Sequence, residues 1–139
     1  LPASAPPPPG RAGGAPPSAA INQRAVNLLA DAPGVAWATF STLCEEPRSA
    51  ADYVEMAREY HTVLIEQIPL LDRDKEDAAR RFINLVDEFY DRNVKLIATA
   101  AQLPEALYNG SRLRFEFDRT VSRLQEMRTQ EYLKAEHRP

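Results

Sequence analysis

The sequence is poor in the residues that build disulfides, metal sites and catalytic centres. Its 139 residues include one cysteine, Cys44, and two histidines, His61 and His137. A single cysteine cannot form an internal disulfide, and such usage is typical of a reducing compartment. One thiol and two scattered imidazoles do not suffice for a zinc site, so we predict no metal site. We interpret Cys44 as a small buried apolar residue and both histidines as incidental.

Two further features are missing, a long apolar run and a phosphate-binding loop. No stretch approaches the ~20 apolar residues of a transmembrane helix, which predicts no membrane span. The pattern G-x-x-x-x-G-K-S/T is absent, and the glycines near the start are accompanied by no lysine. Without that backbone cradle for phosphates, we expect this chain alone neither to bind nor to hydrolyse ATP. We therefore assign no catalytic residue to it.

The charge pattern argues against nucleic-acid binding. The net charge is −3, and the arginines near the end of the chain are interspersed with acids: Glu116, Asp118, Glu126 and Glu131. A surface neutralised in this way lacks the basic stripe that binds phosphates. We therefore predict no nucleic-acid partner.

The first 20 residues differ in composition from the rest. Prolines, glycines and alanines dominate residues 1–20, and a stretch with so little to bury is expected to be a disordered linker. The residues 21–139 then form the folded part. A transit peptide is the alternative interpretation of the alanines, the prolines and Arg11. The start at Leu1 rather than Met favours a fragment or a processed product.

The pattern that organises the folded part lies between Asp74 and Tyr108. Apolar residues recur there at spacings of three and four, which predicts an amphipathic helix. Its buried face comprises Phe82, Leu85, Val86, Phe89 and Tyr90. Asp74 is the expected N-cap, and Asn93 is the expected left-handed residue at the other end. The nearly uncharged run Val94–Ala101 follows and predicts a buried strand.

A second buried strand is predicted upstream, at Thr62–Ile68. Strand, helix and strand in this order describe a parallel pair joined by a right-handed crossover, so the expected fold class is α/β. The sequence also predicts a strand or extended segment at Val35–Phe40, a helix capped by Ser49, and a final helix from about Phe115 to Leu133, with an extended beginning as the alternative. Parallel sheets are normally covered by helices on both faces. This chain has few helices, which favours a piece of a larger protein.

Several segments of the chain, in order, resemble one known family. They are GVAWATFSTLC at Gly34–Cys44, PRSAADY at Pro47–Tyr53, HTVLIEQIP at His61–Pro69, ARRFINLVDEFYDRNVKL at Ala79–Leu96, LYNG at Leu107–Gly110 and FDRTVSRLQEMRTQEYL at Phe117–Leu133. These segments are similar to the C-terminal part of the ZapE / Afg-type ATPases, AAA-like P-loop enzymes of bacterial cell division and of mitochondria. The resemblance extends over most of the chain, from Ile21 to Leu133.

The resemblance implies a partial P-loop AAA-like domain with a C-terminal helix. The phosphate-binding loop, the acidic Mg-binding strand and the first sensor then precede this sequence, so ATP and Mg2+ belong to the intact parent. The implied partners are the remainder of the ATPase, proteins of the division machinery and further copies of the chain. The implied location is the bacterial cytoplasm or, alternatively, mitochondria. A stand-alone interaction module without nucleotide chemistry is the alternative function.

Arginines supply the candidate site residues. Arg80 and Arg81 open the central helix just past a strand, where ligands of α/β sheets gather. This position makes them the candidates for nucleotide sensing in the parent. The rival interpretation is helical pairing with the acids four residues earlier, Glu76 and Asp77. Arg119 and Arg123 of the last helix are the candidates for a subunit interface.

Overall fold

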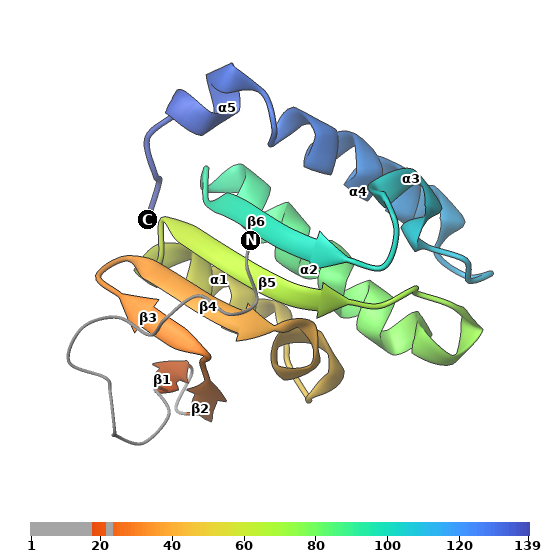
Figure 1. Ribbon diagram of the computed structural model, residues 1–139, viewed down its shortest axis with the longest axis horizontal. Coiled ribbons are helices and arrows are strands. Elements are labelled where there is room, and N and C mark those ends of the chain that lie inside the picture. The colour runs from red at the N-terminus through yellow and green to blue at the C-terminus, as the bar shows by residue number, and fades with distance from the viewer. Residues whose placement is uncertain (1–17, 22–23) are drawn as a thin grey trace.

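The computed structural model describes residues 18–21 and 24–139 of the chain. A sheet with the order β3-β4-β5-β6 forms its centre, with β3 at Ala30–Ala32, β4 at Val35–Thr39, β5 at Thr62–Ile68 and β6 at Lys95–Ala100. The strands β4, β5 and β6 are parallel, whereas β3 pairs with β4 in antiparallel fashion (Figure 1). The predicted α/β class with parallel strands and crossover helices is confirmed.

Two helices connect the parallel strands and lie on the same face of the sheet (Figure 1). Helix α1, Ala50–Glu59, joins β4 to β5, and helix α2, Glu76–Asp91, joins β5 to β6. Ser49 and Asp52 form a capping box at the start of α1, which confirms the predicted cap. Among the described residues, no helix lies over the opposite face of the sheet.

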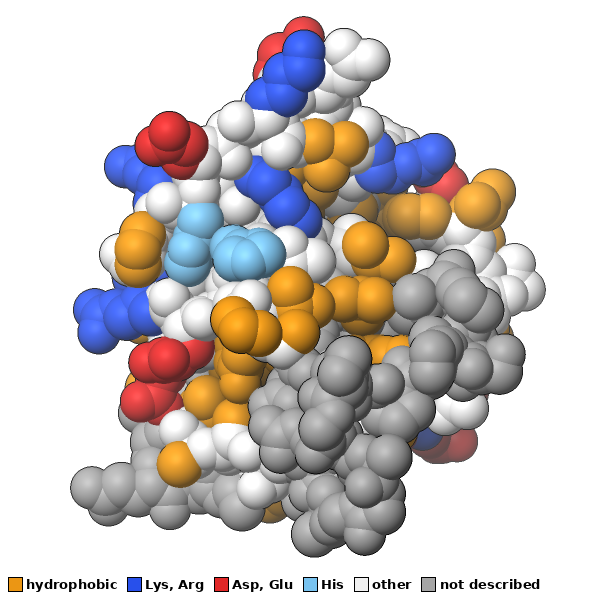
Figure 2. All heavy atoms as spheres, turned by 60° about the vertical axis from the view of Figure 1, so that its left-hand side comes forward, with side chains coloured by type: hydrophobic (Ala, Val, Ile, Leu, Met, Phe, Trp, Pro, Cys, Tyr) orange, Lys and Arg blue, Asp and Glu red, His pale blue; other side chains and the backbone are white. Residues whose placement is uncertain are grey.

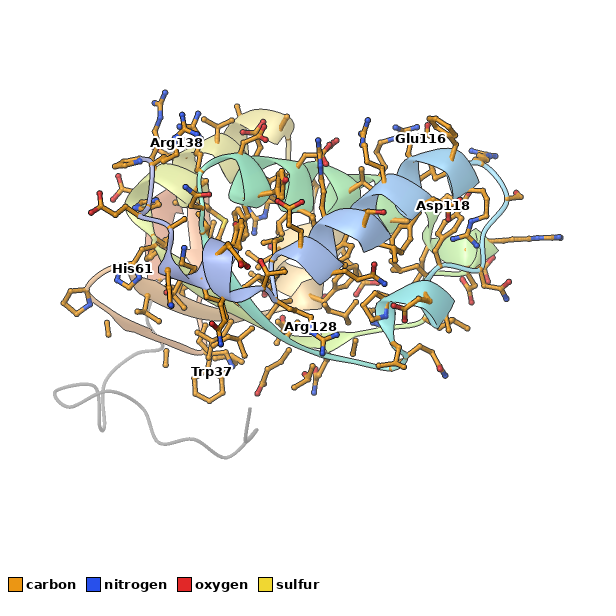
Figure 3. The ribbon with its side chains drawn as sticks, turned by 90° about the horizontal axis from the view of Figure 1, so that it is seen from above. Trp37, His61, Glu116, Asp118, Arg128 and Arg138 are labelled. Carbon is orange, nitrogen blue, oxygen red and sulfur yellow. The ribbon has the colours of Figure 1, made fainter. Side chains whose placement is uncertain are left out.

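The core lies between these two helices and the sheet. Val63 and Ile65 of β5 are fully buried and point toward the helices. The predicted apolar face of α2 is buried against them and comprises Phe82, Leu85, Val86 and Phe89, with Tyr90 at its margin. Trp37 of β4 points away from the helices, as the view along the sheet shows (Figure 3).

The start of α2 differs from the prediction that Asp74 is its N-cap. A 3-10 turn, η2 at Arg73–Lys75, precedes the helix and contains Asp74. The cap of this turn is Asp72, whose side chain accepts a hydrogen bond from the Asp74 backbone N–H at 3.0 Å. The acid two residues earlier therefore takes the capping role, because the chain already turns at Arg73. At the other end, Asn93 has the predicted left-handed conformation with φ 56°.

The strand β6 was predicted to be buried, and this prediction is wrong, because the strand is partly exposed. Within the described sheet β6 is an edge strand. The Ile97 side chain is 45% exposed, and Ala98 and Ala100 are also exposed. An apolar run therefore identified the strand correctly but not its surroundings. Ile97 lies in register with Leu64 and Trp37 on the face that no described helix covers (Figure 3), and no described strand lies beside β6.

The end of the chain contains two helices where one was predicted. Helix α4 at Arg114–Glu126 packs along α2, and helix α5 at Gln130–Lys134 follows it. A short helix, α3 at Pro104–Leu107, connects β6 to α4 (Figure 1). The expected single helix Phe115–Leu133 is interrupted because Thr129 caps α5, its hydroxyl accepting a hydrogen bond from the Tyr132 N–H at 3.3 Å.

The proline-rich start lies mostly outside the described residues. The predicted linker 1–20 falls on undescribed residues up to position 17. Ser18–Ile21 forms strand β1, which pairs with β2 at Arg24–Asn27, so the described structure begins three residues before the predicted boundary. None of the helices in the part of the chain that the structure describes has the length and apolar character needed to cross a membrane.

Candidate functional site

The carboxyl ends of β4 and β5 meet at one edge of the sheet because the two strands are parallel. The chain leaves β4 through a π-helical turn, η1 at Ser41–Glu45, and leaves β5 through Pro69 toward α2. Ligands of open α/β sheets gather at such an edge, and single-turn π-helices are frequent at functional sites. This edge is therefore the candidate functional site.

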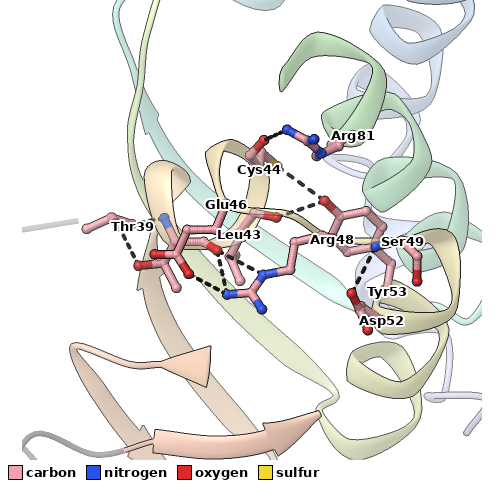
Figure 4. Close-up of polar contacts among 10 residues, drawn as sticks. Thr39, Leu43, Cys44, Glu46, Arg48, Ser49, Asp52, Tyr53 and Arg81 are labelled. Carbon is pink, nitrogen blue, oxygen red and sulfur yellow. Dashed lines mark hydrogen bonds and ion pairs between the residues drawn. The ribbon is translucent and has the colours of Figure 1, made fainter. Parts of the chain in front are cut away.

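Side chains from several elements hold the carbonyl groups of η1 (Figure 4). Arg48 donates two hydrogen bonds to the Thr42 carbonyl, from Nε at 3.0 Å and from Nη2 at 2.9 Å. The Tyr53 hydroxyl of α1 donates to the Leu43 carbonyl at 2.8 Å. Arg81 of α2 donates to the Cys44 carbonyl at 3.2 Å. Three successive carbonyls are thereby fixed, which makes η1 a rigid connection between β4 and both helices.

The two candidate sensing arginines occupy different environments. Arg81 is half-buried, and one of its five N–H groups donates a hydrogen bond to the Cys44 carbonyl. Arg80 lies at the surface with a side chain 54% exposed, and its Nη1 is 3.9 Å from Glu116 Oε2 of α4. An exposed ion pair of this length contributes little to stability. The structure thus gives Arg81 a positioning contact and leaves Arg80 facing solvent.

Glu76 has partners other than the predicted arginine. Its carboxylate accepts hydrogen bonds from the Tyr108 hydroxyl at 2.5 Å and from the Arg112 backbone N–H at 2.8 Å. The bond from Tyr108 is the main reason why the pKa of Glu76 is lowered. A Cβ on Gly110 would collide with the Glu76 carboxylate and lie 2.6 Å from the Tyr108 hydroxyl. A side chain at position 110 would therefore displace the Glu76 carboxylate from its hydrogen bonds with Tyr108 and Arg112.

The predicted interface arginines both contact α2 of the same chain. Arg119 Nη2 lies 3.3 Å from Asp87 Oδ2, and Arg123 makes an ion pair with the other Asp87 oxygen. The Arg123 guanidinium also lies 5.1 Å from the centre of the Tyr90 ring. Arg119 remains 51% exposed. These contacts attach α4 to α2, and the interface role of both arginines stays a prediction.

The Cys44 thiol is unsuited to nucleophilic chemistry. The side chain is fully buried, and burial raises the pKa of the thiol to about 12. Burial also raises the pKa of the neighbouring Tyr53 hydroxyl. Because the thiolate is the nucleophilic form of cysteine, Cys44 is a structural residue, as the sequence predicted. Within the described residues, no three His, Cys, Asp or Glu side chains are arranged to hold a metal ion.

The opposite edge of the sheet is closed by the end of the chain. Lys95 at the start of β6 donates from Nζ to the carbonyls of Asn93, Tyr132 and Ala135, at 2.9, 2.9 and 2.6 Å. His61 and His137 lie side by side on this surface, with ring centres 6.5 Å apart (Figure 2). The two histidines, which the sequence analysis interpreted as incidental, therefore contact each other at this edge of the sheet.

Some contributors to the site were not identified from the sequence. Arg48 and Tyr53 fall inside the PRSAADY segment, and Tyr108 and Gly110 fall inside LYNG, but none was assigned a role. The arginine next to a proline and the lone glycine were the available signals. Arg48 and Tyr53 bind backbone carbonyls, which carry no sequence signal, and Tyr108 binds a carboxylate 32 residues away, which only the folded chain brings near.

Comparison with known proteins identifies the family. The family model described as AFG1-like ATPase matches residues 14–136. The chain is 46% identical over 121 residues to "Cell division protein ZapE" of Escherichia coli K12, covering 87% of this chain and 32% of that protein. It is 35% identical to "Lactation elevated protein 1 homolog B" of Danio rerio, covering 81% of this chain and 29% of that protein.

No solved structure matches the chain, and the chain spans about a third of the length of these two relatives. The family model nevertheless extends over the sheet, both crossover helices, the η1 edge and the α4–α5 segment. The chain therefore belongs to the AFG1-like ATPase family.

Proposed function

We propose that this chain is the C-terminal part of an ATP-hydrolysing protein that acts in cell division in the bacterial cytoplasm. ATP and Mg2+ are bound by a phosphate-binding loop outside this sequence. This chain completes the core sheet of the ATPase that carries the loop. Membership of the AFG1-like ATPase family supports the chemistry, and the 46% identity to a bacterial cell division protein supports the process. Its partners are then the rest of the ATPase, division proteins and further copies of the chain.

The edge of the sheet beside η1 is the part of this chain that we assign to nucleotide sensing. The observation that carries the assignment is the Arg81 contact, which links α2 after β5 to η1 after β4. Arg81 holds the edge in place, and Arg80, 54% exposed at the start of the same helix, has only a 3.9 Å contact with Glu116 to give up in order to reach a phosphate. A guanidinium at this position stabilises charge that grows on the transferred phosphoryl group.

The proposed role is tested by transplanting this chain into a relative. In Escherichia coli ZapE, the segment that matches this chain is replaced by residues 14–136, and ATP turnover is measured. Turnover within about tenfold of ZapE itself is expected, because the two segments share a fold and 46% of their residues. The isolated chain serves as the comparison and should show neither ATP binding in calorimetry nor turnover. A folded chimera without turnover contradicts the proposal.

The two arginines are then separated from each other in the active chimera. Arg80→Ala should lower kcat by roughly ten- to a thousandfold with the fold intact, as removal of one charge-stabilising donor does. Arg81→Ala should lower kcat and also destabilise the chimera, since it frees the Cys44 carbonyl. Arg58→Ala is the matched control, because Arg58 is exposed at the end of α1, at the opposite edge of the sheet. Turnover unchanged by Arg80→Ala and Arg81→Ala alike contradicts the assignment.

The interface assignment is a separate part of the proposal. Arg119 is half-exposed on α4 although one nitrogen contacts Asp87, so a neighbouring subunit can still reach it. In the same chimera, Arg119→Ala should weaken self-association without lowering the unfolding midpoint by more than a few degrees. Sedimentation of the chimera with and without ATP measures this effect.

A further inference from the structure

An apolar groove of about 720 Å3 runs along the exposed side of β6. Residues from β6, α2, α3 and α4 line it, including Ile97, Phe82, Leu107, Leu124 and Met127. Among the described lining residues, Arg128 in the turn after α4 is the one that carries a charge (Figure 3). Leu103, also in the lining, is 71% exposed and Ile97 is 45% exposed. A mostly apolar surface of this kind, with polar residues such as Gln102 and Arg128 in its lining, marks a binding site for apolar groups.

The backbone beside the groove adds a second requirement. Lys95 and Ala101 donate their N–H groups toward β5, to the carbonyls of His61 and Ile68, both at 2.8 Å. Alternate residues of a paired strand direct their N–H and C=O groups to opposite sides. The groups of Leu96, Ala98 and Ala100 therefore point away from β5, at an edge where the described sheet has no further strand. Backbone groups beside an apolar groove call for hydrogen-bond partners.

We propose that an extended apolar segment pairs with β6 as an additional strand and places its side chains in the groove. The segment comes from the part of the ATPase outside this sequence, so this inference rests on the proposed function. The relatives are about three times as long as the matched region, which supplies the chain length for such a strand. An edge of outward N–H and C=O groups fits a strand better than a helix or a small ligand, because those cannot satisfy the repeating backbone groups.

Hydrogen exchange resolved to single amides tests the pairing directly. The isolated chain is compared with the ZapE chimera that carries residues 14–136. The amides of Leu96, Ala98 and Ala100 should exchange roughly a hundredfold more slowly in the chimera, because a new ladder protects them. The amides of Lys95 and Ala101 are internal controls, since β5 already binds them in both proteins. Outward amides that exchange equally fast in both proteins overturn the inference.

A proline substitution tests the same edge by a different route. Ala98→Pro removes an N–H that points away from β5, which edge strands tolerate. The urea midpoint of the isolated chain should stay nearly unchanged, whereas that of the chimera should fall clearly. Ala98→Gly is the matched control, because it loosens the strand but keeps the N–H group. Equal midpoints for the Pro and Gly variants of the chimera overturn the inference, and if proline unfolds the isolated chain, the exchange measurement decides.

The remaining outcomes distinguish a failure of the added strand from a failure of the proposed function. Outward amides protected in a concentrated, dimeric sample of the isolated chain would show that a second copy fills the groove, which overturns the proposed source. An inactive chimera with newly protected amides would refute the proposed function and keep the added strand. An active chimera with unprotected amides would keep the proposed function and refute the strand.

Discussion

The neighbouring strands β5 and β6 are alike in sequence and very different in surroundings. Both are short apolar runs in the same parallel sheet. In β5, Val63 and Ile65 are fully buried beneath α1 and α2. In β6, Ile97 is 45% exposed and lines an open groove. The comparison shows that the described residues bury the helix-covered side of β5, whereas they leave an apolar groove open beside β6.

The largest expected effect comes from truncating one apolar side chain in each region. Phe89 of α2 is fully buried, so Phe89→Ala should lower the free energy of unfolding by roughly 3–5 kcal/mol. Ile97→Ala in the isolated chain should cost less than about 1 kcal/mol, because half of this side chain already contacts water. Urea denaturation followed by circular dichroism measures both.

The substitutions Phe89→Ala and Ile97→Ala can also be compared in the ZapE chimera. In the ZapE chimera, Ile97→Ala should become more costly than in the isolated chain, since an added strand buries the side chain. Phe89→Ala should cost about the same in both proteins. A large loss for Ile97→Ala in the isolated chain would show that the β6 side is already closed.

A smaller effect is expected from the arginines at the η1 edge. Arg81→Ala leaves the Cys44 carbonyl without its donor at 3.2 Å, and losing a partner of a buried carbonyl costs about 1–3 kcal/mol. Arg80→Ala removes only an exposed pair of 3.9 Å, so it should cost less than about 1 kcal/mol. Thermal unfolding of the two variants compares them. Equal losses would mean that Arg81 does not anchor η1.

The smallest effect is a pH dependence that arises from the buried thiol of Cys44 in η1. The pKa of the Cys44 thiol is raised from 9.0 to about 12 by burial. Between these values the unfolded chain loses the thiol proton while the folded chain keeps it, so stability falls as the pH rises. The slope from this group is at most about 1.4 kcal/mol per pH unit. Cys44→Ala should flatten the decline of the unfolding free energy between pH 9 and pH 10, measured in urea.

Periodicity was sufficient to predict the parts of the fold that depend on one contiguous segment. The α2 face, the β5 bounds, the Ser49 cap and the left-handed Asn93 all follow from local spacing and residue type. The break at Met127–Thr129 was missed because the apolar stripe continues across it. The exposure of β6 was missed because it depends on which elements lie beside the strand and over its faces, and no local pattern carries that information.

The candidate site was predictable only in part. The positions of Arg80 and Arg81 at the carboxyl edge of the sheet followed from the strand–helix order. Their actual partners, Glu116 and the Cys44 carbonyl, are separated from them by 36 and 37 residues. Helical pairing at four residues was the local alternative, and the fold replaced it with contacts to other elements.

Trp37 gives the helix-free face of the sheet its own spectroscopic signal. It is the single tryptophan of the chain, and in the sheet register it stands beside Leu64, which stands beside Ile97. Fluorescence excited at the red edge of the indole absorption band therefore comes from Trp37 and reports on its surroundings alone. The emission colour of Trp37 follows the polarity of these surroundings, and because the side chain is only 9% exposed, unfolding the chain will shift its fluorescence to longer wavelength without any added label.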